Sequence, residues 1–319
     1  MLPPQTWRDL LAKIIQEPGE HERLARAVGV SAQMVMRWIR QEEIPSSHQL
    51  YVLLDEVPQH RALLRTLLLE EFDDFSDGIS ANFSVYVLNL YNTASDETRL
   101  WSICTAVLSE ALQQLDAQRS GLSMSVVQCM EPLRGDNIHC LRECVGLGTF
   151  PGEEQIELRT RFLGAESLAG HAVSSRQPRI VVDIDQEQRF AANLPEHAGS
   201  AAAIPILYTN RIAGCLLAVS SQRNYFRSLT RVNLIKDYAS LLMLAFSPEE
   251  FYAAERIALQ SMPSFQVQQP YLSTLRQRIQ ATWRTAFSAQ RPMSYLEAQR
   301  FVWWQIAEEL LQLQAPPST

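Results

Sequence analysis

The chain has 319 residues, of which 46% are hydrophobic and 20% charged, a composition typical of globular proteins at a length that suits two or three domains. The net charge of −7 excludes a general attraction to nucleic acid, so any such contact must come from a local patch. The sequence has no N-terminal signal region and no apolar run long enough to span a membrane. We therefore expect a soluble, cytoplasmic protein without a membrane partner.

The five cysteines lie in apolar segments, at Cys104, Cys129, Cys140, Cys144 and Cys215. An odd number in such segments favours reduced thiols in a core over a disulfide framework. Cys140 and Cys144 are predicted on one face of a strand, about 13 Å apart, which is too far to share a tetrahedral metal. His139 would lie on the opposite face. Because the sequence also has no zinc-ligand set and no phosphate loop, we predict no metal and no cofactor.

Residues 1–72 are predicted to be helical throughout. Helices are expected over Trp7–Ile15, on both sides of a turn within residues 24–41, from Ser46-Ser47 to near Pro58, and over 59–71. In the last of these, the residues expected to point inward are Leu63, Leu64, Leu67 and Leu68. Together they predict a compact helical head.

The stretch at residues 24–41, LARAVGVSAQMVMRWIRQ, predicts two short helices joined by a tight turn. Gly29 can adopt the left-handed conformation that ends a helix, and Ser31 is placed to cap the next one. The buried stripe of the second helix is expected to be Met34, Val35, Trp38 and Ile39. Arg37 and Arg40 remain on the outward side. This is the layout of a helix-turn-helix, whose second helix enters the DNA major groove.

Residues 7–57 resemble the phage-repressor (Xre/Cro-like) helix-turn-helix family. The resemblance rests on the Val-Gly-Val-Ser turn, the aliphatic-then-Trp core of the second helix and the Ile44-Pro45-Ser46 tail. It implies double-stranded DNA as partner and base contacts from Ala32, Gln33, Met34 and Arg37. Gln can pair with adenine and Arg with guanine. The implied phosphate contacts are Arg23, Arg26, Ser31 and Arg40.

The charge of this region is local. Residues 1–57 hold six basic and eight acidic side chains, a net of −2, which keeps open an adaptor whose head no longer binds DNA. Within residues 21–41, however, four arginines face only Glu22. Affinity from one copy is expected to be weak and dependent on salt, which favours a homodimer that binds two half-sites.

From residue 70 the chain leaves the head. The acidic stretch EEFDDFSDG at 70–78 is the predicted domain edge, and a short helix at 83–91 lies in a linker. A longer helix at 97–116 follows. Strands are then predicted at 122–130, 138–145, 179–182, 201–207 and 212–219, with helices at 168–174 and 230–246. This order predicts an antiparallel sheet with helices on one side.

Residues 95–246 resemble a GAF domain. The matching pieces are LAGHAV (168–173), QPRIVVD (177–183), AAAIPI (201–206) and IAGCLLAV (212–219). The resemblance implies either a sensor that binds a small-molecule effector between sheet and covering loops, or a dimer scaffold. The Asn-Lys-x-x-x-Asp motif of cyclic-nucleotide GAF domains is not present, and the effector stays open.

The candidate pocket residues are Arg142, His171, Asp183, Asp185, Phe190 and His197. Each also has a purely structural interpretation. His171 can pack against the sheet, the two aspartates can cap a loop, and Phe190 can fill the core.

Residues 248–319 are predicted as a C-terminal helical region, broken at Pro263 and Pro270 and divided by Pro292. Adjacent Trp303 and Trp304 cannot face the same side of a helix, so one of them lies at a second interface. That interface is with the GAF-like domain or with a second copy. Alternatively, the helices form a hairpin that covers hydrophobic surface of their own chain.

The fold class is therefore α+β multidomain: a helix-turn-helix DNA-binding domain (1–72), a linker with a short helix (73–96), a GAF-like sensory or dimerisation domain (97–247) and a C-terminal helical hairpin (248–319). The predicted function is sequence-specific transcription regulation by a homodimer, without enzymatic activity. The alternatives are a GAF-fold enzyme that uses a reactive thiol, and the adaptor that has lost DNA binding.

Overall fold

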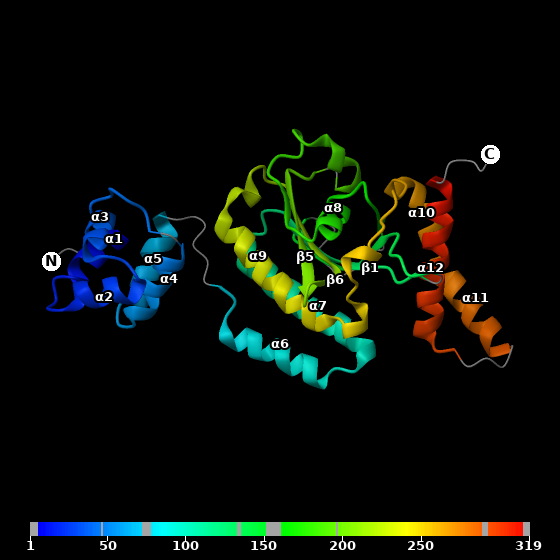
Figure 1. The fold of residues 1–319 in the computed structure, drawn as a ribbon, viewed down its shortest axis with the longest axis horizontal. Coiled ribbons are helices and arrows are strands. Elements are labelled where there is room, and N and C mark those ends of the chain that lie inside the picture. Colours follow the sequence, from blue (N-terminus) through cyan, green and yellow to red (C-terminus); the bar gives the residue numbers. More distant parts are fainter. Residues whose placement is uncertain are drawn as a thin grey trace. The chain divides into compact units, whose positions relative to one another are not determined.

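The computed structural model describes residues 6–45, 47–71, 78–132, 135–150, 161–195, 197–288 and 293–314. The chain divides into two compact units, Met1–Gly78 and Ile79–Thr319 (Figure 1). The predicted acidic boundary at 70–78 falls largely on residues 72–77, which lie outside the described residues.

The first unit is helical in its described part. Its helices are α1 (Trp7–Ile14), α2 (Glu20–Val28), α3 (Ala32–Ile39), α4 (Ser47–Glu56) and α5 (Arg61–Glu71). All of them contribute leucine, valine or tryptophan side chains to one core, in which Trp7, Leu24 and Trp38 are almost fully buried. The prediction for Leu63 is wrong, since its side chain is 43% exposed while Leu64, Leu67 and Leu68 fill the core.

The turn between α2 and α3 is held by caps that the sequence predicts. Gly29 has φ of 75°, a conformation that side chains with a Cβ rarely adopt. The Ser31 hydroxyl accepts a hydrogen bond from the Met34 N–H at 3.2 Å, which satisfies a free donor at the start of α3. At the other end of α3, the buried Arg8 Nε donates to the Trp38 carbonyl oxygen at 3.0 Å. Both ends of α3 are therefore fixed.

The second unit contains a curled six-stranded antiparallel sheet in the order β3-β2-β1-β6-β5-β4. Its strands are β1 (Leu122–Cys129), β2 (Leu141–Gly148), β3 (Phe162–Leu163), β4 (Arg179–Val181), β5 (Ser200–Tyr208) and β6 (Arg211–Ser220). The antiparallel sheet is confirmed. Strand β3 is missing from the prediction, because two residues are too few to show an alternating pattern.

Helices cover both faces of this sheet, so the expectation that they lie on one side is wrong. Helices α7 (Asp96–Leu115) and α9 (Leu229–Leu242) pack on one face, and α6 (Ala81–Thr93) lies against α7 (Figure 1). Helix α8 (Leu168–Ser175) packs on the opposite face with the 3-10 turn η1 (Gln188–Asn193). Shorter 3-10 turns are η2 (Tyr225–Arg227), η3 (Met243–Ala245), η4 (Pro248–Glu250) and η5 (Ala254–Arg256).

Strand β2 is interrupted by a bulge, which separates the two cysteines predicted to share a face. Val126 pairs with Val145 and Val127 with Glu143, so Cys144 has no partner in the register. The extra residue shifts the alternation of side chains. As a result, Cys144 packs in the α7 and α9 core, whereas Cys140 contacts the cluster around the C-terminal helices.

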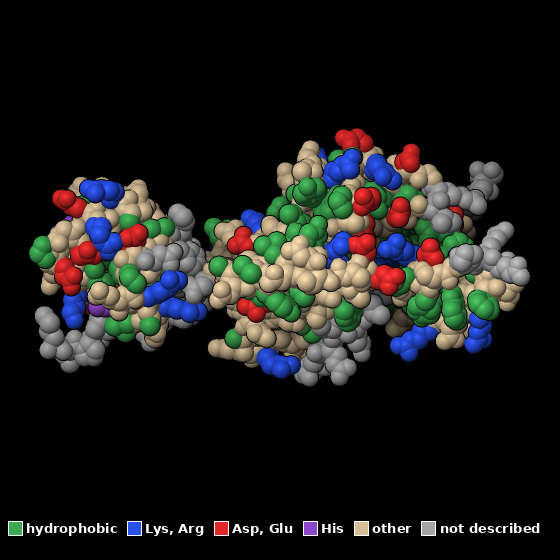
Figure 2. Space-filling model, turned by 90° about the horizontal axis from the view of Figure 1, so that it is seen from below, with side chains coloured by type: hydrophobic (Ala, Val, Ile, Leu, Met, Phe, Trp, Pro, Cys, Tyr) green, Lys and Arg blue, Asp and Glu red, His purple; other side chains and the backbone are tan. Residues whose placement is uncertain are grey.

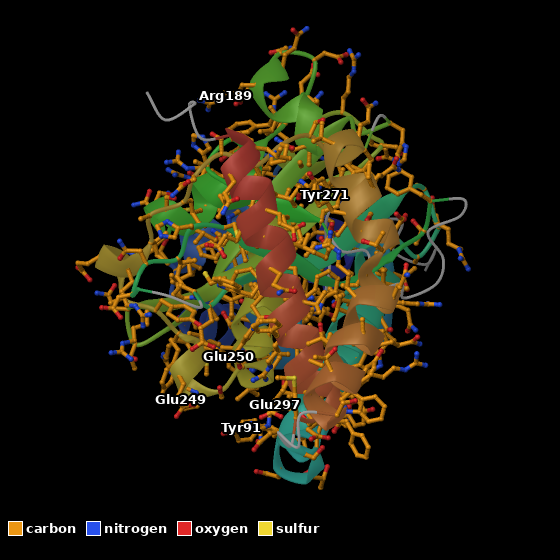
Figure 3. The ribbon with its side chains drawn as sticks, turned by 90° about the vertical axis from the view of Figure 1, so that its right-hand side faces the viewer. Tyr91, Arg189, Glu249, Glu250, Tyr271 and Glu297 are labelled. Atoms are coloured by element: carbon orange, nitrogen blue, oxygen red, sulfur yellow. The ribbon has the colours of Figure 1, made fainter. Side chains whose placement is uncertain are left out.

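The C-terminal helices are α10 (Phe265–Ser273), α11 (Leu275–Ser288) and α12 (Tyr295–Gln314), and they pack against β3 at the edge of the sheet. Figure 3 looks onto α12, with α10 and α11 beside it. Pro270 lies inside α10 and does not end it, while Pro292 lies outside the described residues. Trp303 is buried against the Phe162 ring at 6.0 Å, and Trp304 is half-buried. The two tryptophans thus face different sides, as predicted.

One buried side chain ties α10 to the open edge of β3. Gln268 is 2% exposed; its Oε1 accepts from the Phe162 N–H at 2.9 Å, and its Nε2 donates to the Phe162 and Pro263 carbonyl oxygens at 2.8 Å each. The amide therefore acts as a short substitute for a neighbouring strand. It satisfies backbone groups of the edge strand that would otherwise be buried without partners.

We expect Gln268→Leu to lower the free energy of unfolding by about 2–4 kcal/mol, because it leaves buried backbone donors and acceptors unpaired. Gln266→Leu, on an exposed position of the same helix, is the matched control. Urea denaturation followed by circular dichroism measures both. Equal midpoints for the two variants would show that this bridge does not stabilise the unit.

Candidate nucleic-acid interface and candidate ligand sites

Helix α3 presents a row of polar side chains on its outer face. Gln33, Arg37 and Arg40 are exposed, while Ala32 and Met34 are half-buried. Gln33 and Arg37 are four residues apart, so they lie one above the other on the same side of the helix. Val35 and Trp38 anchor the inner side in the core. The first unit therefore leaves this row clear of its own packing.

The charge on this row is weakly neutralised. The nearest carboxylate to Arg37 is that of Glu43, at 3.8 Å, and the Arg37 side chain is 47% exposed. An exposed pair at this separation contributes little, so the guanidinium can exchange that partner for another acceptor. Arg26 on α2 and Ser31 at the start of α3 are also exposed, although the Ser31 hydroxyl already caps the helix.

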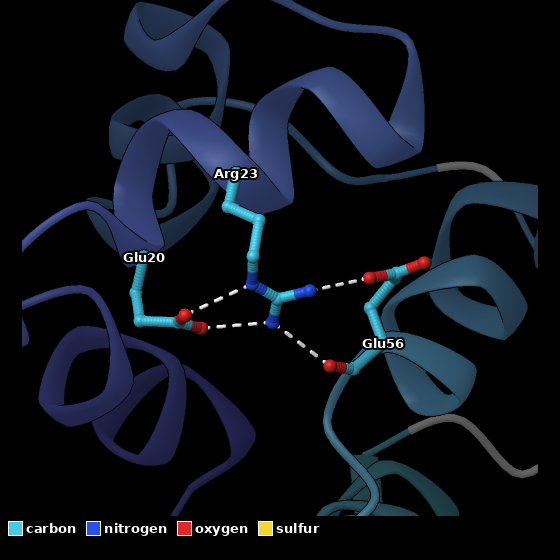
Figure 4. Close-up of polar contacts among 3 residues, drawn as sticks. All are labelled: Glu20, Arg23 and Glu56. Carbon is cyan, nitrogen blue, oxygen red and sulfur yellow. Dashed lines mark hydrogen bonds and ion pairs between the residues drawn. The ribbon is translucent and has the colours of Figure 1, made fainter.

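Arg23 has a different role from the one implied by the resemblance. Its guanidinium is bound by Glu20 on the same helix at 2.8 and 2.9 Å and by Glu56 at the end of α4, with contacts of 2.5 and 2.9 Å (Figure 4). The hydrogen bond from Arg23 is the main cause that lowers the pKa of Glu20. Arg23 thus links α2 to α4, and a phosphate would have to displace two carboxylates to reach it. We assign it to packing of the head.

His21 is a residue of this interface that the sequence pattern does not single out. Its Nε2 lies 2.8 Å from the Ala32 carbonyl oxygen, where it joins α2 to the first turn of α3. A half-buried histidine on the polar side of a helix carries no periodic signal. Its contact is visible only once the two helices are placed together.

On the sheet, Arg142 faces the C-terminal helices. Its guanidinium carbon lies 5.1 Å from the centre of the Trp303 ring, and its Nη2 is 3.4 Å from the Gln128 amide oxygen. Gln128 in turn donates to Glu250 at 2.7 Å. Burial is the main cause that lowers the pKa of Arg142.

His171 and Phe190 lie together on the α8 side of the sheet. Their rings meet edge to face at 5.1 Å, and Phe190 is 2% exposed within the core that includes Val181 and Cys215. Phe190 therefore fills the core, which was its structural interpretation. His171 packs against it from α8.

The remaining candidates hold loops. The Asp183 carboxylate accepts hydrogen bonds from the Asp185 N–H and from the Gln186 side chain, each at 3.1 Å, and Asp185 pairs with Arg223. The His197 ring stacks near Phe150 at 4.1 Å. The described structure therefore distributes the six predicted pocket residues among separate environments, because the face under α8 is occupied by hydrophobic side chains.

The comparisons with known proteins agree on the middle of the chain. The family model described as "GAF domain" matches residues 100–246. These residues form a GAF domain. Among solved structures, 35 chains match. A search of curated proteins finds no match to the chain.

Three of the structures illustrate the range of proteins with which the GAF domain shares its fold. The GAF domain of Acinetobacter phosphoenolpyruvate-protein phosphotransferase is 15% identical with a TM-score of 0.36, covering 52% of this chain and 93% of that chain. The type II free methionine-R-sulfoxide reductase from Thermoplasma acidophilum is 17% identical with a TM-score of 0.36, covering 50% and 98%. The GAF-B domain of DevS from Mycobacterium smegmatis is 22% identical with a TM-score of 0.30, covering 44% and 86%. At these identities and scores the likeness carries no information on ligand or activity.

The thiols of the GAF domain are all buried and unpaired. Burial is the main cause that raises the pKa of every one of them, to about 11 for Cys144 and about 12 for Cys140. A thiol reacts as its thiolate, so a raised pKa and a buried sulfur both slow attack on an external substrate.

We expect the folded protein at pH 8 to show no rapidly reacting thiol towards Ellman's reagent, and all five to react in guanidinium chloride. The folded pKa values lie above those of the unfolded chain, so the thiolate population at pH 8 is smaller in the native state than in the denatured state. The denatured sample is the control for total thiol. One cysteine that reacts within seconds in the native protein would revive the thiol enzyme.

Two further observations concern the described residues. No group of three His, Cys, Asp or Glu side chains is gathered there in a way that could hold a metal ion. None of the helices in that part of the chain combines the length and apolar character needed to cross a bilayer.

A cavity of about 220 Å³ lies where the GAF domain meets α12. Its lining residues come from the end of β1, the segment before β2 and one face of α12, and they are Met130, Glu131, Pro132, His139, Cys140, Trp304, Ala307, Glu308 and Leu311. None of the predicted pocket residues lines it.

Proposed function

We propose that this protein is a dimeric, sequence-specific DNA-binding transcription regulator, in which the first unit reads DNA with α3 and the GAF domain senses a small molecule or holds two copies together. The observation that carries the proposal is the outward row of Gln33, Arg37 and Arg40 on a helix fixed at both ends. A helix that reads base edges must be both exposed and rigid.

The chemistry of the row suits base recognition. A glutamine side chain can donate to and accept from adenine, and an arginine can donate twice to guanine in the major groove. Ala32 and Met34, half-buried at the start of the helix, would make van der Waals contacts. We propose Arg26, Ser31 and Arg40 as the phosphate contacts, with Arg23 left to its carboxylates.

A single short helix gives weak affinity, and we propose that two copies pair through α6. This helix, ANFSVYVLNLYNT, contains no charged residue. Val87 is buried against the GAF core, while the hydrophobic residues on its other sides are exposed, namely Val85, Tyr86, Leu88 and Tyr91. Figure 2 shows hydrophobic side chains in contact with solvent on this face of the second unit. An uncharged apolar helix can meet its twin without repulsion.

The position of α6 supports this pairing. It begins at Ala81, directly after the first unit ends at Gly78, so a contact between two α6 helices would tether two heads close together. The sensing role is a further step. An effector regulates only if it binds one dimer geometry better than another, and α7, which packs on both α6 and the sheet, is the path we propose for that coupling.

A mobility-shift assay with the full chain and fragmented genomic DNA from its source tests the function. We expect a subset of fragments to shift in the presence of excess nonspecific DNA, with an affinity that falls steeply as salt rises. If no fragment is preferred at any salt concentration, the adaptor interpretation replaces the regulator.

A further inference from the structure

The cavity beside α12 has a chemical character of its own. Its walls are apolar or aromatic, from Met130, Pro132, Ala307, Leu311 and Trp304. Its acidic residues are Glu131 and Glu308, both exposed. The lining contains no lysine and no arginine. The cavity thus combines an apolar wall with two carboxylates.

His139 adds a third acceptor to this lining. Its Nδ1 lies 3.1 Å from the Ala258 carbonyl oxygen, and a carbonyl can only accept a hydrogen bond. This contact places the ring proton on Nδ1 in the neutral imidazole and leaves Nε2 as an acceptor. The ionisable groups that line the cavity would then present acceptors to a ligand, apart from the weakly donating, buried Cys140 thiol.

We propose that this cavity binds a small organic cation, a primary ammonium carried on an aromatic or aliphatic body. The ammonium group needs acceptors, which the glutamates and His139 supply, and an indole face such as that of Trp304 attracts a cation. The body occupies the apolar wall. A cavity of 220 Å³ is larger than the roughly 150 Å³ that suffices for benzene, so a phenyl ring with a short amine chain fits.

The site lies outside the α8 face on which a GAF ligand was expected, and it belongs to the seam between the GAF domain and the C-terminal helices. Trp304, Ala307 and Glu308 are on α12, while Met130 and Cys140 belong to the sheet side. A bound cation would therefore contact both parts at once and stabilise their packing. The proposal does not depend on DNA binding, and its test contains no DNA.

The test uses the full chain and three probes of the same shape: 2-phenylethylamine, 2-phenylethanol and 3-phenylpropanoate. Ligand-observed NMR titration gives the three dissociation constants. We expect the amine to bind about tenfold more tightly than the alcohol, because a hydrogen bond to an ionised group is stronger than a neutral one, and the carboxylate to bind most weakly. Equal affinities for amine and alcohol, or binding by none of the probes, would overturn the proposal.

Two variants locate the site. Glu308→Gln removes one carboxylate at the cavity and should weaken amine binding about tenfold while leaving the alcohol unchanged. Glu97→Gln, an exposed glutamate on α7 away from the cavity, removes the same charge and should leave both unchanged. If the two variants weaken the amine equally, the attraction comes from the overall negative charge of the protein and this site is wrong.

Discussion

The double replacement Gln33→Ala and Arg37→Ala should lower the affinity of the protein for its preferred DNA sequence by about 2–6 kcal/mol, because each side chain that reads a base contributes roughly 1–3 kcal/mol of discrimination. The head should stay folded, since both side chains are exposed and neither contributes to the core. Fluorescence anisotropy with a labelled site measures the change, and circular dichroism checks the fold. The single variants should lose specificity at different positions of the site.

Lys13→Ala is the matched control for this pair. Lys13 is an exposed cation in the last turn of α1, so its removal costs the head one positive charge without touching α3. We expect at most a small loss that is the same for all DNA sequences. If the control weakens the preferred site as much as the double variant does, the outer face of α3 does not read DNA.

The variant Val85→Glu with Leu88→Glu should convert a dimer into a monomer. Both side chains are about half exposed, at 55% and 47%, on the uncharged helix α6. Pairing through a two-fold axis would bury each of them twice, and placing carboxylates there removes that burial and adds repulsion. We expect the dissociation constant of the dimer to rise by more than about 100-fold, which corresponds to at least about 3 kcal/mol.

Sedimentation equilibrium measures this change directly. The control is Leu229→Glu with Leu313→Glu, two exposed leucines outside α6 that change charge and hydrophobicity by the same amount. DNA affinity should fall with dimerisation in the α6 variant alone, since one head then binds one half-site. A wild-type chain that is monomeric at all concentrations, or an α6 variant that still dimerises, would contradict the proposed interface.

The head was predictable from sequence because its signals are local. Gly29, Ser31 and the spacing of Val35 and Trp38 define a turn, a cap and a buried stripe within about ten residues, and the structure confirms all three. Leu63 was misplaced because apolar periodicity alone does not tell which leucine of a leucine-rich helix faces the core. The partner of Arg23 could not be predicted, since Glu56 lies 33 residues away.

The second unit was predictable as a class and less so in arrangement. Strands of eight to ten residues such as β1, β2 and β6 show their period, whereas β3 is defined by its pairing with β2 and by Gln268, 106 residues further on. The side of the sheet that α8 covers depends on chain crossing, which the order of elements does not encode. The bulge at Cys144 likewise arises from pairing.

The candidate ligand site shows the same limit. Arg142, His171 and Asp183 are polar or aromatic-neighbouring residues in the expected segments, but packing directs each to a different partner. The residues that do line a cavity come from segments up to 181 positions apart, from Met130 to Leu311, where 311 − 130 = 181. No spacing within one motif could bring them together.

The most direct measurement of the central claim is selection of DNA from a random pool by the full chain, followed by sequencing of the bound fraction. The account predicts one enriched motif with two-fold symmetry, its half-sites about 10 base pairs apart, with the enrichment abolished in the Gln33→Ala, Arg37→Ala double variant. A bound pool without a shared motif, or the same motif from the double variant, would contradict it.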